Sequence, residues 1–186
     1  MLLVMRERET KVELHATADE VRRAVSEGPE IMKWFEPVAT VTPGADETVM
    51  VSWGPGLEGD LKATRRGWPI FLAALKHGLE RHKGEPVLQV GATGFSSLGT
   101  EAVWTALLEA VDGVQTNVWR QVGPGFVRAI VDDWNDAFLF ALCEPVNDKF
   151  SVTVQVVLYG EEVARAAKHR DWVESTMAAA EAQPLG

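Results

Sequence analysis

The chain has 186 residues, of which 46% are hydrophobic and 24% charged, and 27 acidic residues outnumber 18 lysines and arginines to give a formal net charge of −9. This composition is that of an ordinary folded protein, and it excludes a disordered, collagen-like or membrane-spanning chain. The acidic surplus repels phosphate backbones, so we expect no nucleic-acid partner.

The chain opens with five apolar residues, a run too short for a signal peptide or a membrane span, and charged residues follow it directly. Cys143 is the single cysteine, which excludes an internal disulfide and fits a reducing compartment. We therefore expect a cytoplasmic protein with no membrane partner.

Residues 1–84 predict a short unit of strands and helices. Residues 11–17 alternate polar and apolar side chains, as a half-buried strand does. Thr17 and Glu20 have the capping-box spacing of a helix that Gly28 ends. A helical turn over 31–35 follows, and the later segments are two strands over 38–41 and 48–53 and an amphipathic helix over 67–84.

Residues 85–186 repeat this order with longer strands. A short apolar run over 87–90 precedes an amphipathic helix over 100–111, and Gly160 precedes a closing helix over 161–182. Between these helices, turn signals separate four strands, over 115–121, 125–132, 137–143 and 149–159.

The residue types that usually carry out catalysis or bind metal ions do not occur at the spacings that a catalytic or metal site requires. None of the four histidines pairs with another metal ligand, and His169 is expected on the polar side of the last helix. Ser96 and Ser97 lack the glycine spacing of a nucleophile elbow, and Cys143 is expected to be a buried, inert thiol. We therefore predict no catalytic residue, no metal ion and no cofactor.

The aromatic content is the feature that points to a function, since the chain has seven tryptophans and seven phenylalanines but one tyrosine. Large rings that share one interior fill a core, and where they interdigitate poorly they leave a cavity for an apolar molecule. The predicted ligand-binding residues are Trp34, Phe35, Trp53, Trp68, Phe71, Leu75, Trp119, Phe126, Phe138, Phe140 and Trp172.

Two segments of the first half resemble the START-like, helix-grip superfamily (also called SRPBCC), in particular its branch of Hsp90-ATPase activator homologues. They are residues 10–37, TKVELHATADEVRRAVSEGPEIMKWFEP, and residues 67–84, GWPIFLAALKHGLERHKG. The chain departs from the family in two ways: Arg22 stands where the first motif has tryptophan, and only about 30 residues separate the two segments.

The second half echoes the same motifs, in EAVWTALLEAV over 101–111 and in YGEEVARAAKHRDWVESTM over 159–177. The resemblance therefore implies an α+β helix-grip fold, in which a curved antiparallel sheet packs around a long C-terminal helix. We expect one START-like domain over 1–186, built from half-repeats 1–84 and 85–186 that share one sheet, because half of the chain would bury little surface alone.

The resemblance also implies a pocket between the sheet and the closing helix, since its members carry lipids, cyclise polyketides, assist Hsp90 or protect bacteria that make enediyne antibiotics. The first hypothesis is non-catalytic binding or sequestration of an apolar or polycyclic small molecule, in natural-product biosynthesis or self-resistance. A second is a polyketide cyclase or aromatase that uses His15, Arg128 and Asp132. The third is a chaperone partner or homodimer that pairs through open strand edges, so that the protein is a monomer or a homodimer.

Overall fold

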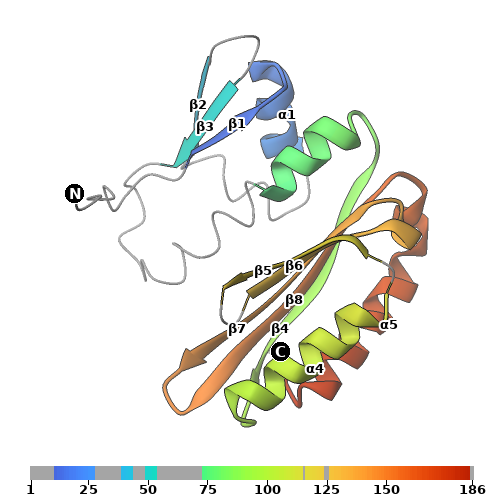
Figure 1. The fold of residues 1–186 in the computed structure, drawn as a ribbon. Coiled ribbons are helices and arrows are strands. Elements are labelled where there is room, and N and C mark those ends of the chain that lie inside the picture. The colour runs from blue at the N-terminus through green and yellow to red at the C-terminus, as the bar shows by residue number, and fades with distance from the viewer. Residues whose placement is uncertain are drawn as a thin grey trace, which may run out of the picture. The chain divides into compact units, whose positions relative to one another are not determined.

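The computed structural model describes residues 11–27, 39–43, 49–53, 73–114, 116–123 and 126–184. The chain divides into two compact units, Met1–Gly84 and Glu85–Gly186 (Figure 1). We call them unit 1 and unit 2 and describe each by itself.

Unit 1 contains a three-stranded antiparallel sheet in the order β1-β3-β2, formed by β1 (Lys11–Leu14), β2 (Ala39–Pro43) and β3 (Val49–Trp53). Helix α1 (Ala18–Glu27) connects the first two strands, and a further helix spans residues 73–81. Leu14, Val21 and Leu75 are buried, which gives this unit apolar contacts of its own.

Unit 2 contains a six-stranded antiparallel sheet in the order β5-β6-β7-β8-β4-β9 (Figure 1). The strands are β4 (Val87–Ser96), β5 (Thr116–Gly123), β6 (Phe126–Val131), β7 (Ala137–Val146), β8 (Lys149–Tyr159) and β9 (Gln183–Pro184). Two helices, α4 (Thr100–Asp112) and α5 (Ala166–Ala179), pack on one face of this sheet, α4 against β7 and α5 against β4 and β8. Two 3₁₀ helices, η1 (Asp132–Trp134) and η2 (Gly160–Arg165), connect β6 to β7 and β8 to α5.

Every second side chain along the strands contributes to the core of unit 2. The side chains on the helix-bearing face are small and aliphatic, and they bury against Val103, Leu107 and Val111 of α4 and Val173 and Met177 of α5. The strand residues of this core are Val90, Val127, Ala129, Val131, Ala137, Leu139, Ala141, Cys143, Val152, Val154, Val156 and Leu158. Successive strand residues point to opposite faces, so the residues between these lie on the other side of the sheet.

The α+β class predicted from the sequence is confirmed, but the described strands form two sheets instead of one shared sheet. The reason is that, among the described strands, each unit pairs its own first strand with its own last long strand, β1 with β3 and β4 with β8. The central strands therefore have both edges occupied within their unit. The prediction of one START-like domain over 1–186, with half-repeats 1–84 and 85–186, stays a prediction.

Two segment predictions differ in extent from the structure. The short apolar run over 87–90 is the start of a strand that continues to Ser96, whose buried hydroxyl donates to the Ala180 carbonyl oxygen at 2.7 Å. The closing helix predicted over 161–182 begins as the 3₁₀ helix η2 and becomes α-helical at Ala166. The helical turn predicted over 31–35 lies outside the described residues. Among the helices that the structure describes, none is both long enough and apolar enough to cross a bilayer.

Candidate functional site

The structure describes some of the predicted ligand-binding residues and not others. Trp34, Phe35, Trp68 and Phe71 lie outside the described residues. Three more belong to described strands only through their backbone: Trp53 pairs with Ala39, Trp119 with Ala129 and Phe126 with Leu142.

The remaining four predicted residues are fully described, one in unit 1 and three in unit 2, and the three of unit 2 do not all lie on the same face of the sheet. Leu75 is buried in unit 1. In unit 2, Trp172 of α5 packs against the core on the helix-bearing face, whereas Phe138 and Phe140 of β7 alternate with the core residue Leu139 and so lie on the opposite face. The sheet itself therefore separates Trp172 from the two phenylalanines.

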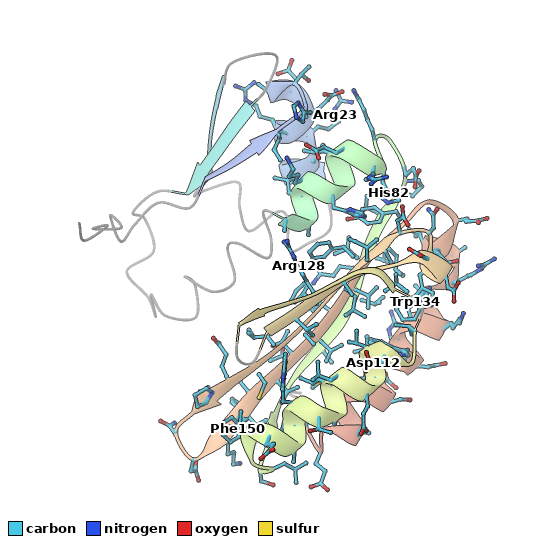
Figure 2. The ribbon with its side chains drawn as sticks, viewed as in Figure 1. Arg23, His82, Asp112, Arg128, Trp134 and Phe150 are labelled. Carbon is cyan, nitrogen blue, oxygen red and sulfur yellow. The ribbon has the colours of Figure 1, made fainter. Side chains whose placement is uncertain are left out.

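We call the side of the six-stranded sheet opposite α4 and α5 the Phe140 face. Figure 2 shows Arg128 pointing away from α4 and α5 on this side, while Trp134 lies on the side of the helices. The register places Arg128, Phe140, Gln155 and Gly91 next to one another on four adjacent strands. One row further along, the same strands carry Ile130, Phe138, Val157 and Gln89.

The Phe140 face combines buried rings with partly exposed polar groups. Phe138 and Phe140 are each 3% exposed, and their ring centroids lie 6.5 Å apart at an interplanar angle of 58°. Beside them, the Gln89 amide Nε2 donates to the Gln155 Oε1, and the hydroxyls of Thr93 and Thr153 are hydrogen bonded at 3.0 Å. The face thus offers an apolar wall next to hydrogen-bonding groups, which is the combination that small-molecule sites use.

The sequence analysis missed Gln89, Gly91 and Gln155, although a signal was present. Ser151, Thr153 and Gln155 alternate with valines along β8, which marks one face of that strand as polar. Gly91 interrupts an otherwise alternating segment, and an isolated glycine in a strand often marks a close approach of another group.

A second concentration of polar groups lies at the junction of η2 and α5. Glu162 is 2% exposed and His169 is fully buried, and the His169 Nε2 lies 2.6 Å from the Glu162 Oε2. The Arg165 guanidinium donates to the other carboxylate oxygen at 2.5 Å. The Trp134 ring meets the His169 ring in a T-shaped contact with 4.6 Å between centroids.

The prediction that His169 lies on the polar side of the last helix is wrong, because its ring is buried and hydrogen bonded to Glu162. Burial raises the pKa of the Glu162 carboxyl, but the hydrogen bond with His169 and the charge of Arg165 outweigh burial, and the net pKa lies below its ordinary value. Since Glu162 and His169 have almost no contact with solvent, this pair connects η2 to α5 and does not face a substrate.

The residues considered for catalysis occupy different environments. His15 is exposed in unit 1, and its backbone N–H donates to the Glu80 carboxylate. Arg128 lies on the Phe140 face, and Asp132 begins η1. Burial, with a smaller contribution from the Glu144 charge, raises the pKa of the Cys143 thiol, and the prediction that this thiol is buried is confirmed. Within the described part of the chain, no group of three or more His, Cys, Asp and Glu side chains could hold a metal ion.

In comparisons with known proteins, no family model and no curated protein matches this chain, so they show no family for it. It is similar to the di-domain ARO/CYC StfQ from the steffimycin biosynthetic pathway, with 11% identity over 93% of this chain and 94% of that chain, at a TM-score of 0.36. It is also similar to DynU16, a protein of the dynemicin biosynthetic locus, with 16% identity over 94% and 96% of the two chains, at a TM-score of 0.29. At identities and TM-scores this low, neither likeness carries an argument about family or function.

Proposed function

We propose that unit 2 binds an apolar, planar small molecule on the Phe140 face without reacting with it. The observation that carries this proposal is the position of Phe138 and Phe140 directly beside the Gln89–Gln155 amide pair, on the face of the sheet that neither α4 nor α5 occupies. The helix-bearing face is already filled by aliphatic side chains, so the pocket is proposed for the opposite side of the sheet from the one that the START-like resemblance implies.

The proposed ligand and the Phe140 face have complementary surfaces. A planar molecule can lie over the partly exposed side chains of Gln155 and Thr153, and its edge reaches the Phe140 ring, which is only 3% exposed, when the side chains around that ring move apart. Aromatic rings favour edge-to-face and offset contacts, which add about 0.5–1.5 kcal/mol beyond the burial of apolar area. The role in biosynthesis of a polycyclic natural product, or in self-resistance to it, is proposed on the sequence resemblance alone.

The test is a binding titration with planar two- to four-ring compounds, followed by calorimetry on the full chain. Phe140→Leu keeps an apolar side chain in place but removes the ring, and we expect it to weaken binding about tenfold, which corresponds to about 1.4 kcal/mol. Phe150→Leu is the matched control, because Phe150 packs against the core cluster on the other side of the sheet. Equal affinity in both variants, or no binding of any compound by the unmodified chain, would contradict the proposal.

A further inference from the structure

Strand β4 has an outer side that is only partly covered. On its inner side, β8 pairs with β4 over its whole length, from Val87 to Ser96. On its outer side, β9 pairs only with Gly94 and Phe95. Residues 87–93 therefore have no neighbouring strand on that side among the strands that the structure describes. We call this segment the β4 edge.

The hydrogen-bond pattern shows which backbone groups of the β4 edge point outward. The Gly160 N–H donates to the Pro86 carbonyl oxygen at 2.9 Å, one position before Val87 pairs with Tyr159. In an antiparallel pair, residues that exchange hydrogen bonds with their partner alternate with residues that do not. Every second residue from Leu88 onward therefore bonds to β8. The N–H and carbonyl groups that point away from β8 are those of Val87, Gln89, Gly91 and Thr93.

The β4 edge lacks the features that usually keep an open strand from pairing. Folded proteins protect such edges with charged residues, proline or β-bulges. The sequence VLQVGAT over 87–93 contains no charge and no proline, its register with β8 is continuous, and Gly91 in its middle is exposed. The opposite edge of the sheet, β5, carries Arg120 and has two register shifts against β6. The β4 edge is thus the better suited of the two to accept a further strand.

A second copy of β4, running antiparallel to the first, would satisfy all of these outward groups. When Val90 of each copy lies on a twofold axis, Gln89 is opposite Gly91 of the second copy and Val87 is opposite Thr93 of the second copy. These are the four residues whose backbone groups point outward, and each then exchanges hydrogen bonds with its partner. A twofold axis pairs the same segment with itself, as it does in most homodimers.

The ends and the side chains of the segment fit the same arrangement. Pro86 has no backbone N–H to donate, and Gly94 already pairs with β9. The twofold axis places Pro86 of one copy opposite Gly94 of the other, so that pairing stops at both ends of the β4 edge. On the side of the sheet that bears α4 and α5, Val90 meets Val90 of the second copy and Leu88 meets Ala92, and all of these side chains are apolar.

We infer that the β4 edge is a self-association site, at which two copies of this chain join their six-stranded sheets into one continuous sheet. A second copy is the occupant because the outward groups, the apolar pairs and the two ends of the segment are all self-complementary. The inference does not depend on ligand binding at the Phe140 face.

The test measures the mass of the full chain by sedimentation equilibrium at several concentrations and the exchange of its backbone amides by NMR. We expect a monomer–dimer equilibrium in which the amides of the outward residues Val87, Gln89, Gly91 and Thr93 become protected as the dimer forms. The amides of Leu88, Val90 and Ala92 should be protected in both states, because they bond to β8.

Gln89→Pro removes one outward N–H group but no hydrogen bond to β8, and edge strands tolerate proline at such positions. Each dimer loses two hydrogen bonds, so we expect the dissociation constant to rise about thirtyfold, which corresponds to about 2 kcal/mol. Gln89→Ala is the matched control, because it removes the same side-chain amide and keeps the backbone N–H. It should dimerise as the unmodified chain does. Circular dichroism verifies that both variants are folded.

Four outcomes would overturn the inference. They are a monomer at every concentration, a dimer whose outward amides exchange freely, equal dissociation constants for the two Gln89 variants, and protection of the outward amides in the monomer. The last would mean that another segment of the same chain covers the β4 edge. None of these outcomes decides the proposed function, which has its own binding titration.

Discussion

At the scale of single residues, the Glu162 carboxylate contributes to stability through the two groups that hydrogen bond to it. His169 and Arg165 contact its two oxygens at 2.6 Å and 2.5 Å. Hydrogen bonds to a charged group contribute about 1.5–3 kcal/mol. We therefore expect Glu162→Gln to lower the free energy of unfolding by about that amount at neutral pH, as measured by urea denaturation.

The effect of this substitution should depend on pH. The pKa of Glu162 is lower in the folded chain than its ordinary value of 4.5, so folding favours the ionised form. The contribution is fully present above pH 4.5 and is lost as the pH falls through the lowered pKa. The stability difference between the unmodified chain and Glu162→Gln should thus shrink in acid. Glu161→Gln, at the exposed neighbouring position, should leave stability unchanged at every pH.

The wrong prediction for His169 shows a limit of predicting burial from residue type. His169 lies four residues before the buried Val173 and therefore on the same side of α5. Because histidine is polar, His169 was nevertheless predicted to lie at the surface. The hydrogen-bond partner that allows its burial does not belong to the helical period of α5. Glu162 belongs to the preceding 3₁₀ helix, which has about 3.0 residues per turn instead of 3.6. Only the structure shows that the two side chains meet.

At the scale of elements, the start of α1 is the segment that the sequence predicts best. The capping box is confirmed, since the Thr17 N–H donates to the Glu20 carboxylate at 2.8 Å and the Glu20 N–H donates to the Thr17 hydroxyl at 3.3 Å. The ion pair with Lys83, followed by the hydrogen bonds from Thr17, lowers the pKa of Glu20 to about 2. The signal is local, because the cap and its partner are three residues apart.

Removal of this cap has a definite expected cost. Thr17→Ala deletes the hydroxyl acceptor of the Glu20 N–H, and the loss of an N-cap side chain costs about 1 kcal/mol. We expect the free energy of unfolding of unit 1 to fall by that amount, as measured by chemical denaturation followed by circular dichroism. Thr17→Ser keeps a hydroxyl at the cap and should retain most of the stability. Equal losses in both variants would show that the hydroxyl does not act as a cap.

Strand β4 illustrates why other elements were predicted less well. Its apolar run ends at Val90, and Gly91 and Gly94 then lower the strand propensity. The strand nevertheless continues to Ser96, because β8 pairs with it over its whole length, from Val87 opposite Tyr159 to Ser96 opposite Phe150. A partner about 60 residues away in the sequence supplies these hydrogen bonds, and a local pattern does not contain it.

At the scale of the whole molecule, the START-like resemblance implied the α+β class, whereas the pairing of the strands determines how they are divided between sheets. In the described part of each unit, a strand comes first, a helix follows, and the first strand pairs with the last long strand. Each unit therefore has its own open sheet, where the sequence predicted a shared sheet. The candidate site was missed for the same reason, since Gln89 and Gln155 become neighbours only through the pairing of β4 with β8.

Because the described strands of unit 2 pair only with one another, we predict that residues 85–186 fold without the first 84 residues. The core between α4, α5 and the strands is drawn entirely from this unit, and it includes the fully buried Val103, Leu107 and Leu139. We expect a chain of residues 85–186 to unfold cooperatively in urea and to show dispersed amide signals in NMR spectra. Its matched control begins at residue 100 and lacks β4, which pairs with β8 and packs against α5. This control should not fold, because removing β4 exposes the edge of β8 and one side of α5. An unfolded 85–186 chain would mean that the core of unit 2 depends on the first half for its stability.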